Sequence, residues 1–183
     1  MMVDRKEPID QVKDTETNGI IFVPIGHYAL SDNPIHYQES SPNFAIYGLG
    51  SCIALILFDN IKKVSAMSHI LLPKVNIDEN EIVYPHKYAN ISVKLLFETL
   101  LNQGAMRDNI KALIVGGSRI FNLENNDMGS NNIHAVKKAL NKLQIQIVSE
   151  DIGGPIGRNV IFDTHYFSLY VKTTQETDFN RIY

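Results

Sequence analysis

Apolar and polar positions are arranged along the chain in a pattern that predicts mostly short strands. Apolar runs of strand length occupy residues 20–24, 44–47, 53–58, 64–72, 113–115, 145–148, 159–162 and 167–171. The run Ile53–Phe58 contains no polar residue, which is typical of a strand covered on both faces, although a buried helical segment has the same pattern. Turn-forming residues such as Asp59 and Asn60 separate neighbouring runs.

Two longer segments have the period of an amphipathic helix. Residues 86–103 carry apolar side chains at helical spacing and are followed by Gly104, which can end a helix. Residues 131–143 repeat this spacing. We find no internal repeat and no linker between two domains. The pattern therefore predicts a single α+β layered domain of mixed, mainly antiparallel β-sheets flanked by two main helices.

The two ends of the chain are polar and lack periodicity. We expect residues 1–18 to form a mobile N-terminal tail and residues 173–183 to form a polar C-terminal tail. Residues 19–172 then form the folded domain. The full length of 183 residues suits one such domain.

Composition excludes several classes of function. A net charge of −3 gives no support for nucleic-acid binding. No apolar run approaches the ~20 residues that span a bilayer, so we expect no membrane insertion. The N-terminal segment lacks the apolar stretch of a secretory signal, and the single cysteine cannot form an internal disulfide, so we expect a cytoplasmic location. The six histidines show no metal-binding spacing, so we predict no metal site.

The single cysteine, Cys52, and one histidine, His69, lie beside two neighbouring strands. Cys52 has a simple alternative interpretation as a small buried apolar residue, and His69 as a core histidine satisfied by the backbone. Their spacing favours chemistry instead. If residues 53–58 and 64–70 form a hairpin with a loop of two residues (60–61) or, as we expect, of four (59–62), Cys52 lies directly opposite His69 on one face, with Cβ atoms ~4.5–5.5 Å apart.

Glycines before the cysteine add to this hypothesis. Gly48 and Gly50 permit a sharp turn, and backbone N–H groups near Gly50 and Ser51 could hold an oxyanion. A neighbouring imidazole would favour the thiolate, so we expect a partly exposed and reactive Cys52. This combination indicates acyl transfer through a thiol, and the reaction needs no cofactor.

Several strings of residues occur together along the chain. Residues 48–55 read Gly-Leu-Gly-Ser-Cys-Ile-Ala-Leu, and residues 67–73 read Met-Ser-His-Ile-Leu-Leu-Pro. Others lie at residues 25–29, 87–90, 116–121, 132–136 and 151–158. In this order, over about residues 22–172, they resemble the chemotaxis deamidase family CheD, which implies a CheD-like cysteine hydrolase fold.

The resemblance also implies a function. CheD proteins convert selected chemoreceptor glutamines to glutamate, with the cysteine as nucleophile and the histidine as base, roles that carry over to Cys52 and His69. It implies methyl-accepting chemotaxis receptors and a CheC-type phosphatase as partners. The glycine-rich loop of residues 151–158, with Gly153, Gly154 and Arg158, becomes a candidate substrate-facing loop, although it equally suits a strand connection that needs glycine.

Two positions depart from the family pattern: Asn131, where the family commonly has arginine, and a second position that bears on catalysis. The family usually has a catalytic threonine six residues before the cysteine, where it orients the histidine, and this chain has Ile46. A backbone carbonyl or the hydroxyl of Ser51, Ser68 or Tyr47 could orient His69 instead. We therefore expect Ile46→Thr to raise deamidation several-fold. The alternative is a weakly active or inactive regulator that acts by binding receptors or the CheC phosphatase.

Overall fold

The computed structural model describes residues 11–12, 19–31, 42–75, 82–120 and 127–183. A six-stranded sheet runs in the order β1 (Gln11–Val12), β3 (Tyr28–Ser31), β6 (Val64–Ile70), β5 (Ile53–Asp59), β7 (Lys111–Gly116) and β8 (Gln146–Ile152). A five-stranded sheet runs in the order β11 (Asn180–Arg181), β10 (Ser168–Thr173), β9 (Arg158–Asp163), β4 (Asn43–Leu49) and β2 (Ile20–Phe22). The helices are α1 (Ala89–Asn102) and α2 (Met128–Lys142), with short 3-10 helices at Pro85–Lys87 and Arg107–Asn109.

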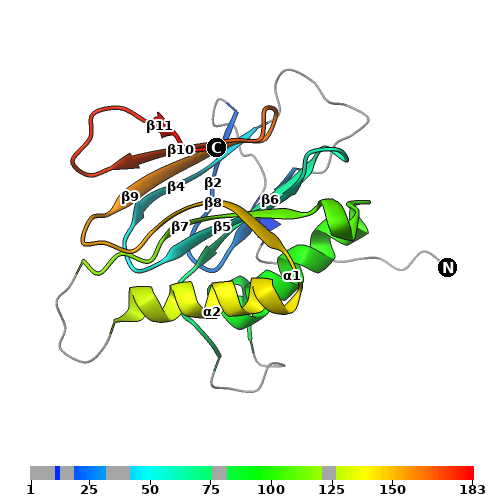
Figure 1. Ribbon diagram of the computed structural model, residues 1–183, viewed down its shortest axis with the longest axis horizontal. Coiled ribbons are helices and arrows are strands. Elements are labelled where there is room, and N and C mark those ends of the chain that lie inside the picture. Colours follow the sequence, from blue (N-terminus) through cyan, green and yellow to red (C-terminus); the bar gives the residue numbers. More distant parts are fainter. Residues whose placement is uncertain (1–10, 13–18, 32–41, 76–81, 121–126) are drawn as a thin grey trace.

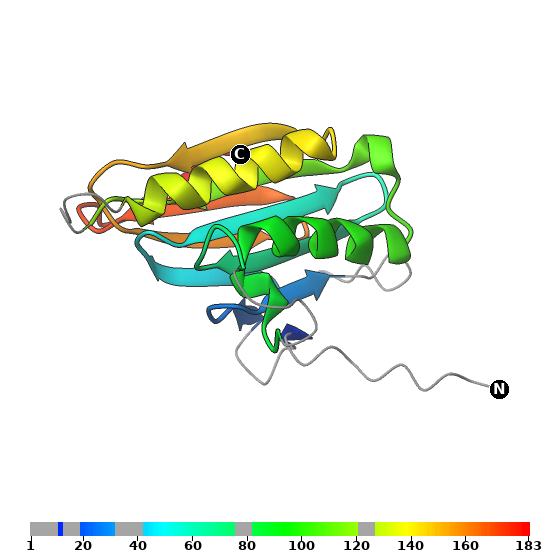
Figure 2. The same cartoon turned by 90° about the horizontal axis from the view of Figure 1, so that it is seen from below.

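The two sheets and the two helices form three layers. Figure 1 shows the sheets stacked face to face, with both helices on the outer face of the six-stranded sheet. Seen from below in Figure 2, α1 and α2 lie side by side across that face. Among the strands of the described residues, the parallel pairs are β1 with β3, β2 with β4 and β7 with β8, and the other pairs are antiparallel. The predicted class, α+β with mixed, mainly antiparallel sheets and two main helices, is confirmed.

The central strand β5 explains the uninterrupted apolar run. Its odd-numbered apolar residues belong to the core beneath the helices, and its even-numbered residues belong to the core between the sheets. Because successive side chains of a strand point to opposite faces, a strand between two cores must be apolar throughout. Cys52 belongs to the core between the sheets, at the end where β5 begins.

The β5–β6 hairpin has a different register from the predicted one. Asp59 pairs with Val64, and Ala54, rather than Cys52, lies opposite His69. The four-residue loop begins one residue later than predicted, because the Asp59 carboxylate accepts hydrogen bonds from the N–H groups two and three residues ahead, at 2.9 and 3.0 Å. Cys52 and His69 are therefore diagonal neighbours on one face, a relation that places Cβ atoms about 7–8 Å apart in a regular sheet.

The predicted C-terminal tail was wrong, since the chain end is part of the five-stranded sheet. Strand β11 pairs with β10, and beyond it the N–H of Ile182 donates to the carbonyl of Leu169 at 2.8 Å. The ring of Tyr183 lies 5.6 Å from that of Phe58, between centroids. These last two apolar residues dock the end of a segment that is mostly polar. In the predicted N-terminal tail of residues 1–18, residues 11–12 form β1. The rest of this predicted tail lies outside the described residues.

Both helices begin three residues away from their predicted starts, at points set by the residues that precede them. A 3-10 turn that starts at Pro85 precedes α1, so the helix begins three residues after its predicted start. Helix α2 begins three residues before its predicted start because Asp127 caps it, accepting a hydrogen bond from the N–H of Ser130 at 3.0 Å. Neither helix is long and apolar enough to cross a membrane, and the same holds for every helix in the described ranges.

Candidate active site

The turn that carries Cys52 is shaped by an irregularity in β4. The pairing of β4 with β9 shifts register between Ile46 and Leu49, which is a β-bulge. Gly48 lies in this bulge with a φ of +71°, and its N–H donates to the side-chain oxygen of Asn159 at 2.8 Å. The bulge turns the chain from the five-stranded sheet toward the first residue of β5, which places Cys52 at the edge of the core.

The segment after β7 clamps this turn. The N–H of Ser118 donates to the carbonyl of Gly50, and the N–H of Gly117 donates to the carbonyl of Cys52, both at 2.8 Å. A Cβ on Gly116 would lie 2.3 Å from the same Cys52 carbonyl oxygen, so this close approach requires glycine. Among the described residues, the N–H groups of Gly50 and Ser51 donate to no backbone carbonyl, which leaves them as candidate oxyanion donors.

The residues between β2 and β3 wrap around His69. The N–H of Gly26 donates to the carbonyl of His69 at 2.9 Å, and the N–H of His69 donates to the carbonyl of His27 at 3.1 Å. The ring nitrogen Nδ1 of His69 lies 3.0 Å from the carbonyl oxygen of Val23. A carbonyl only accepts, so Nδ1 carries the proton and Nε2 keeps its lone pair. His69 is thereby fixed in the tautomer that a general base requires.

The hydrogen-bond partner of His69 is the Val23 carbonyl and not a side chain at position 46. Ile46 is 2% exposed and packs in the same apolar cluster as Cys52, so its side chain has no polar role. The strand that contains Ile46 still contributes, because the N–H of Val23 donates to the carbonyl of Ala45 at 2.9 Å. Val23 therefore bonds to β4 through its N–H and to the imidazole of His69 through its carbonyl. Of the alternatives open from the sequence, a backbone carbonyl orients His69.

Burial sets the protonation states of the pair. It lowers the pKa of His69 below its ordinary value of 6.5, opposed by the hydrogen bond to Val23 and assisted by the nearby His27. Burial raises the pKa of the Cys52 thiol, and a hydrogen bond from its own backbone N–H opposes this. Cys52 is 9% exposed, less than expected, because it packs in the core between the sheets. At neutral pH the resting pair is a thiol and a neutral imidazole.

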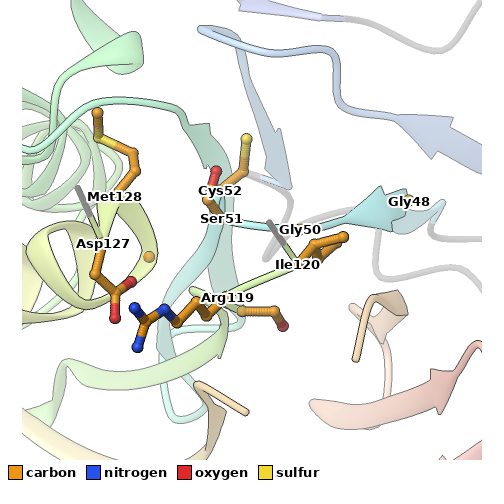
Figure 3. A pocket seen from close by; sticks show the side chains of 10 residues that line it. Gly48, Gly50, Ser51, Cys52, Arg119, Ile120, Asp127 and Met128 are labelled. Carbon is orange, nitrogen blue, oxygen red and sulfur yellow. The ribbon is translucent and has the colours of Figure 1, made fainter. Parts of the chain in front are cut away.

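Cys52 lines a pocket of about 340 Å³ at the surface. Its walls are the turn before β5, the segment after β7 and the first turn of α2, with the lining residues Gly48, Gly50, Ser51, Cys52, Ser118, Arg119, Ile120, Asp127, Met128 and Gly129. Figure 3 shows the guanidinium of Arg119 pointing toward the carboxylate of Asp127. Because the N-terminus of a helix favours negative charge, α2 can stabilise charge that develops in this pocket.

The glycine-rich loop adjoins a neighbouring pocket of about 480 Å³, which Gly153 and Gly154 line. Arg158 lies behind the loop, where its guanidinium donates to Ser118 Oγ at 2.6 Å and to Asp151 at 2.7 Å. It also donates to the carbonyls of Gly153 and Ile156, at 2.8 and 3.0 Å. A substrate contact stays a prediction for the two glycines, whereas the bonds of Arg158 hold the loop in shape. Within the described ranges, no three His, Cys, Asp or Glu side chains group to hold a metal ion.

Comparison with known proteins identifies the family. The family model described as CheD chemotactic sensory transduction matches residues 71–173. A Clostridium botulinum protein named "Probable chemoreceptor glutamine deamidase CheD" is 40% identical over 130 residues, which cover 69% of this chain and 80% of the relative. The chain belongs to the CheD family. "Chemoreceptor glutamine deamidase CheD" of Halalkalibacterium halodurans is 39% identical over 133 residues, which cover 70% of this chain and 82% of that protein.

A solved structure, the hypothetical protein YfiH of Bacillus licheniformis, gives a TM-score of 0.42 at 13% identity, covering 80% of this chain and 65% of that chain. This likeness is too weak to say anything about the CheD site.

Two groups that contact the candidate site of this CheD chain are not predicted from the sequence. The Val23 carbonyl is a backbone group, and its only signal is the neighbouring string of residues 25–29, in which Gly26 permits the tight turn at a φ of +79°. The side-chain amide of Asn132 contacts the turn that carries Cys52, at 2.8 Å from the carbonyl oxygen of Ser51. Its signal is its place at the start of the string of residues 132–136.

Proposed function

We propose that this CheD chain is a protein-glutamine deamidase that converts chemoreceptor glutamines to glutamate through a thioester. The observation that carries the proposal is the hydrogen bond from His69 Nδ1 to the Val23 carbonyl, which supplies an oriented base on the same face as Cys52. The open pocket at Cys52 and the names of the curated relatives support the same reaction.

The resting protonation states determine the first step. The Cys52 thiol transfers its proton to His69 Nε2 as the sulfur attacks the glutamine side-chain carbonyl carbon. The carbonyl electron pair moves onto oxygen, and the backbone N–H groups of Gly50, Ser51 and Cys52 are the proposed donors to that oxyanion. The intermediate collapses as the C–N bond breaks, and the imidazolium returns its proton to the departing ammonia.

Hydrolysis of the thioester completes the cycle. Neutral His69 takes a proton from water as the water oxygen attacks the thioester carbonyl. The C–S bond breaks, the sulfur leaves as thiolate and recovers the proton from the imidazolium, and the product is a glutamate side chain. The only co-reactant is water, and the enzyme returns to its thiol and imidazole state.

The proposed partners follow from the family. Methyl-accepting chemotaxis receptors would supply the glutamines, and a CheC-type phosphatase would bind the same region of the surface. The names of the relatives support the receptors, whereas the phosphatase rests on the resemblance of the sequence alone. An unpaired catalytic thiol suits the reducing cytoplasm, where we place the protein.

Mass spectrometry of a receptor cytoplasmic fragment incubated with the protein tests the proposal. Each deamidated glutamine gains ~1 Da, since thioester hydrolysis replaces an amide by an acid. We expect the gain with the wild type and with His134→Ala, which removes an exposed histidine of α2. Cys52→Ala and His69→Ala should show none. A wild type that binds the fragment without changing its mass would support the regulator instead.

A further inference from the structure

A single buried side chain connects the two segments that carry the candidate catalytic pair. Asn132, in the second turn of α2, is 0% exposed. Its side-chain nitrogen donates to the carbonyl of Ser51 at 2.8 Å and to the carbonyl of Leu71 at 2.9 Å. Ser51 directly precedes Cys52, and Leu71 lies two residues after His69. One amide group therefore bridges the nucleophile segment and the base segment.

This bridge lies where the hairpin ladder has ended. The last pair of β5 and β6 is Ile53 with Ile70. Beyond it the chain leaves β5, because the N–H of Leu71 donates to the carbonyl of Lys87 at 3.0 Å. No ladder bond then orients the peptide between Ser51 and Cys52. The Asn132 amide provides that orientation.

Packing alone does not account for an asparagine at this position. Its side-chain oxygen Oδ1 is buried without a hydrogen-bond partner among the described residues. Burying an unpaired amide oxygen is unfavourable, and a leucine of similar shape would avoid that penalty. Both neighbours of the nitrogen are carbonyls, which only accept, so the orientation of the amide is settled. The residue is explained by what its two N–H bonds hold.

The peptide plane links the Asn132 bond to the chemistry. In a trans peptide the C=O and the following N–H point in opposite directions. Holding the Ser51 carbonyl toward α2 directs the Cys52 N–H away from α2, and this N–H already contacts the Cys52 sulfur. A backbone N–H at the nucleophile is suited to receive the oxyanion of the tetrahedral intermediate.

Building on the proposed deamidase function, we propose that Asn132 is a positioning residue that fixes the Ser51–Cys52 peptide and so aims the Cys52 N–H at the oxyanion. It acts through the backbone and touches no reacting atom. Asn132 therefore stabilises the transition state of acyl transfer, in which the oxyanion forms. It has little effect on substrate binding or on the reactivity of the thiol toward reagents that form no oxyanion.

The test compares two reactions of the same sulfur in Asn132→Leu. For deamidation of a receptor cytoplasmic fragment, we expect kcat to fall about 10- to 100-fold with KM nearly unchanged, since removal of an oxyanion donor itself costs about 10²- to 10³-fold. Alkylation of Cys52 by iodoacetamide, which forms no oxyanion, should change less than about threefold across pH 6 to 9. The control Asn141→Leu makes the same change at an exposed position of α2 and should match the wild type.

The outcomes separate the two proposals. An active wild type together with an Asn132→Leu variant of unchanged kcat overturns the role of Asn132 alone. The same holds if alkylation slows as much as deamidation, because a merely structural role would impair both reactions together. An inactive wild type overturns the deamidase function and this proposal with it. Should Asn132→Leu fail to fold, Asn132→Ser keeps a polar group that cannot reach both carbonyls, and wild-type kcat in that variant is equally decisive.

Discussion

The Ile46→Thr substitution tests how His69 is oriented. From the sequence, a threonine here supplies a missing catalytic hydroxyl and should raise the rate several-fold. The structure changes this expectation, because the Val23 carbonyl already accepts from His69 Nδ1 at 3.0 Å. A new hydroxyl would have to displace that carbonyl before it could reach the nitrogen. We therefore expect deamidation by Ile46→Thr to stay within about threefold of the wild-type rate, since an orienting group matters mainly through the tautomer that it enforces.

The substitution should instead lower stability. Ile46 is 2% exposed, so replacing it removes apolar contacts and buries a hydroxyl. Ile→Val in a core costs about 0.5–1.5 kcal/mol. A buried hydroxyl without a partner adds about 1–3 kcal/mol. The sum, about 1.5–4.5 kcal/mol, is below the usual ~5–15 kcal/mol of a folded domain, so the variant should still fold.

Ile46→Val is the matched control, because valine and threonine have the same shape and differ by the hydroxyl. Urea unfolding gives the free energy of unfolding of each variant, and mass spectrometry of the receptor fragment gives the deamidation rate at a temperature where all are folded. Ile46→Thr should be the less stable of the two, with a similar rate. If Val23 already fixes the tautomer of His69, the added hydroxyl should hardly change the deamidation rate. A rate of Ile46→Thr at least about fivefold above both Ile46→Val and wild type would therefore refute the assignment of Val23 as the orienting group.

Four further predictions concern the titration of two histidines, the space around a backbone glycine and the reactivity of the thiol. Burial lowers the pKa of His86 from 6.5 to about 3, so between these values the unfolded chain binds a proton that the folded protein does not. The free energy of unfolding should therefore fall as pH drops below 6.5, by up to about 1.4 kcal/mol per pH unit from this group. Urea unfolding at two pH values should show a smaller loss in His86→Gln than in the wild type, and equal losses would contradict the assignment. Because burial also lowers the pKa of His69, the acid limb of kcat/KM for deamidation should lie below pH 6.5, and a limb above it would exclude a neutral buried base. Gly116→Ala should unfold at a much lower temperature than Gly104→Ala, since both glycines have positive φ but only the Cβ at residue 116 meets a backbone atom, 2.3 Å away; matching midpoints would argue against the clamp. Cys52 should react with iodoacetamide at neutral pH more slowly than a free thiol, because burial raises its pKa, and a faster reaction would indicate a resting thiolate.

The local pattern of apolar and polar residues predicts much of the architecture. The apolar run of residues 53–58 indicates a strand between two cores, and β5 is that strand. The period of two also determines that Cys52 and His69 share a face, because a hairpin loop of even length preserves parity. These signals depend on side-chain type and on near neighbours, which is why they can be read directly.

The register and the orienting groups depend on contacts that no local pattern encodes. The Asp59 carboxylate shifts the loop and makes Cys52 and His69 diagonal neighbours. The Val23 carbonyl comes from a segment that is 46 residues distant from His69 in the chain. Every residue carries a carbonyl, so the sequence has no letter that marks this one as the acceptor.

The family and the candidate pair, Cys52 and His69, could therefore be named from the sequence by itself, because each depends on residue identity and spacing. The tertiary structure alone decided that a backbone carbonyl replaces the expected threonine at Ile46, and that Asn132 holds the peptide before Cys52. The physical reason is that hydrogen bonds between distant backbone groups form only after the two sheets and α2 have packed. Their geometry depends on the assembled layers, whereas the identity and spacing of the candidate residues are present in the chain itself.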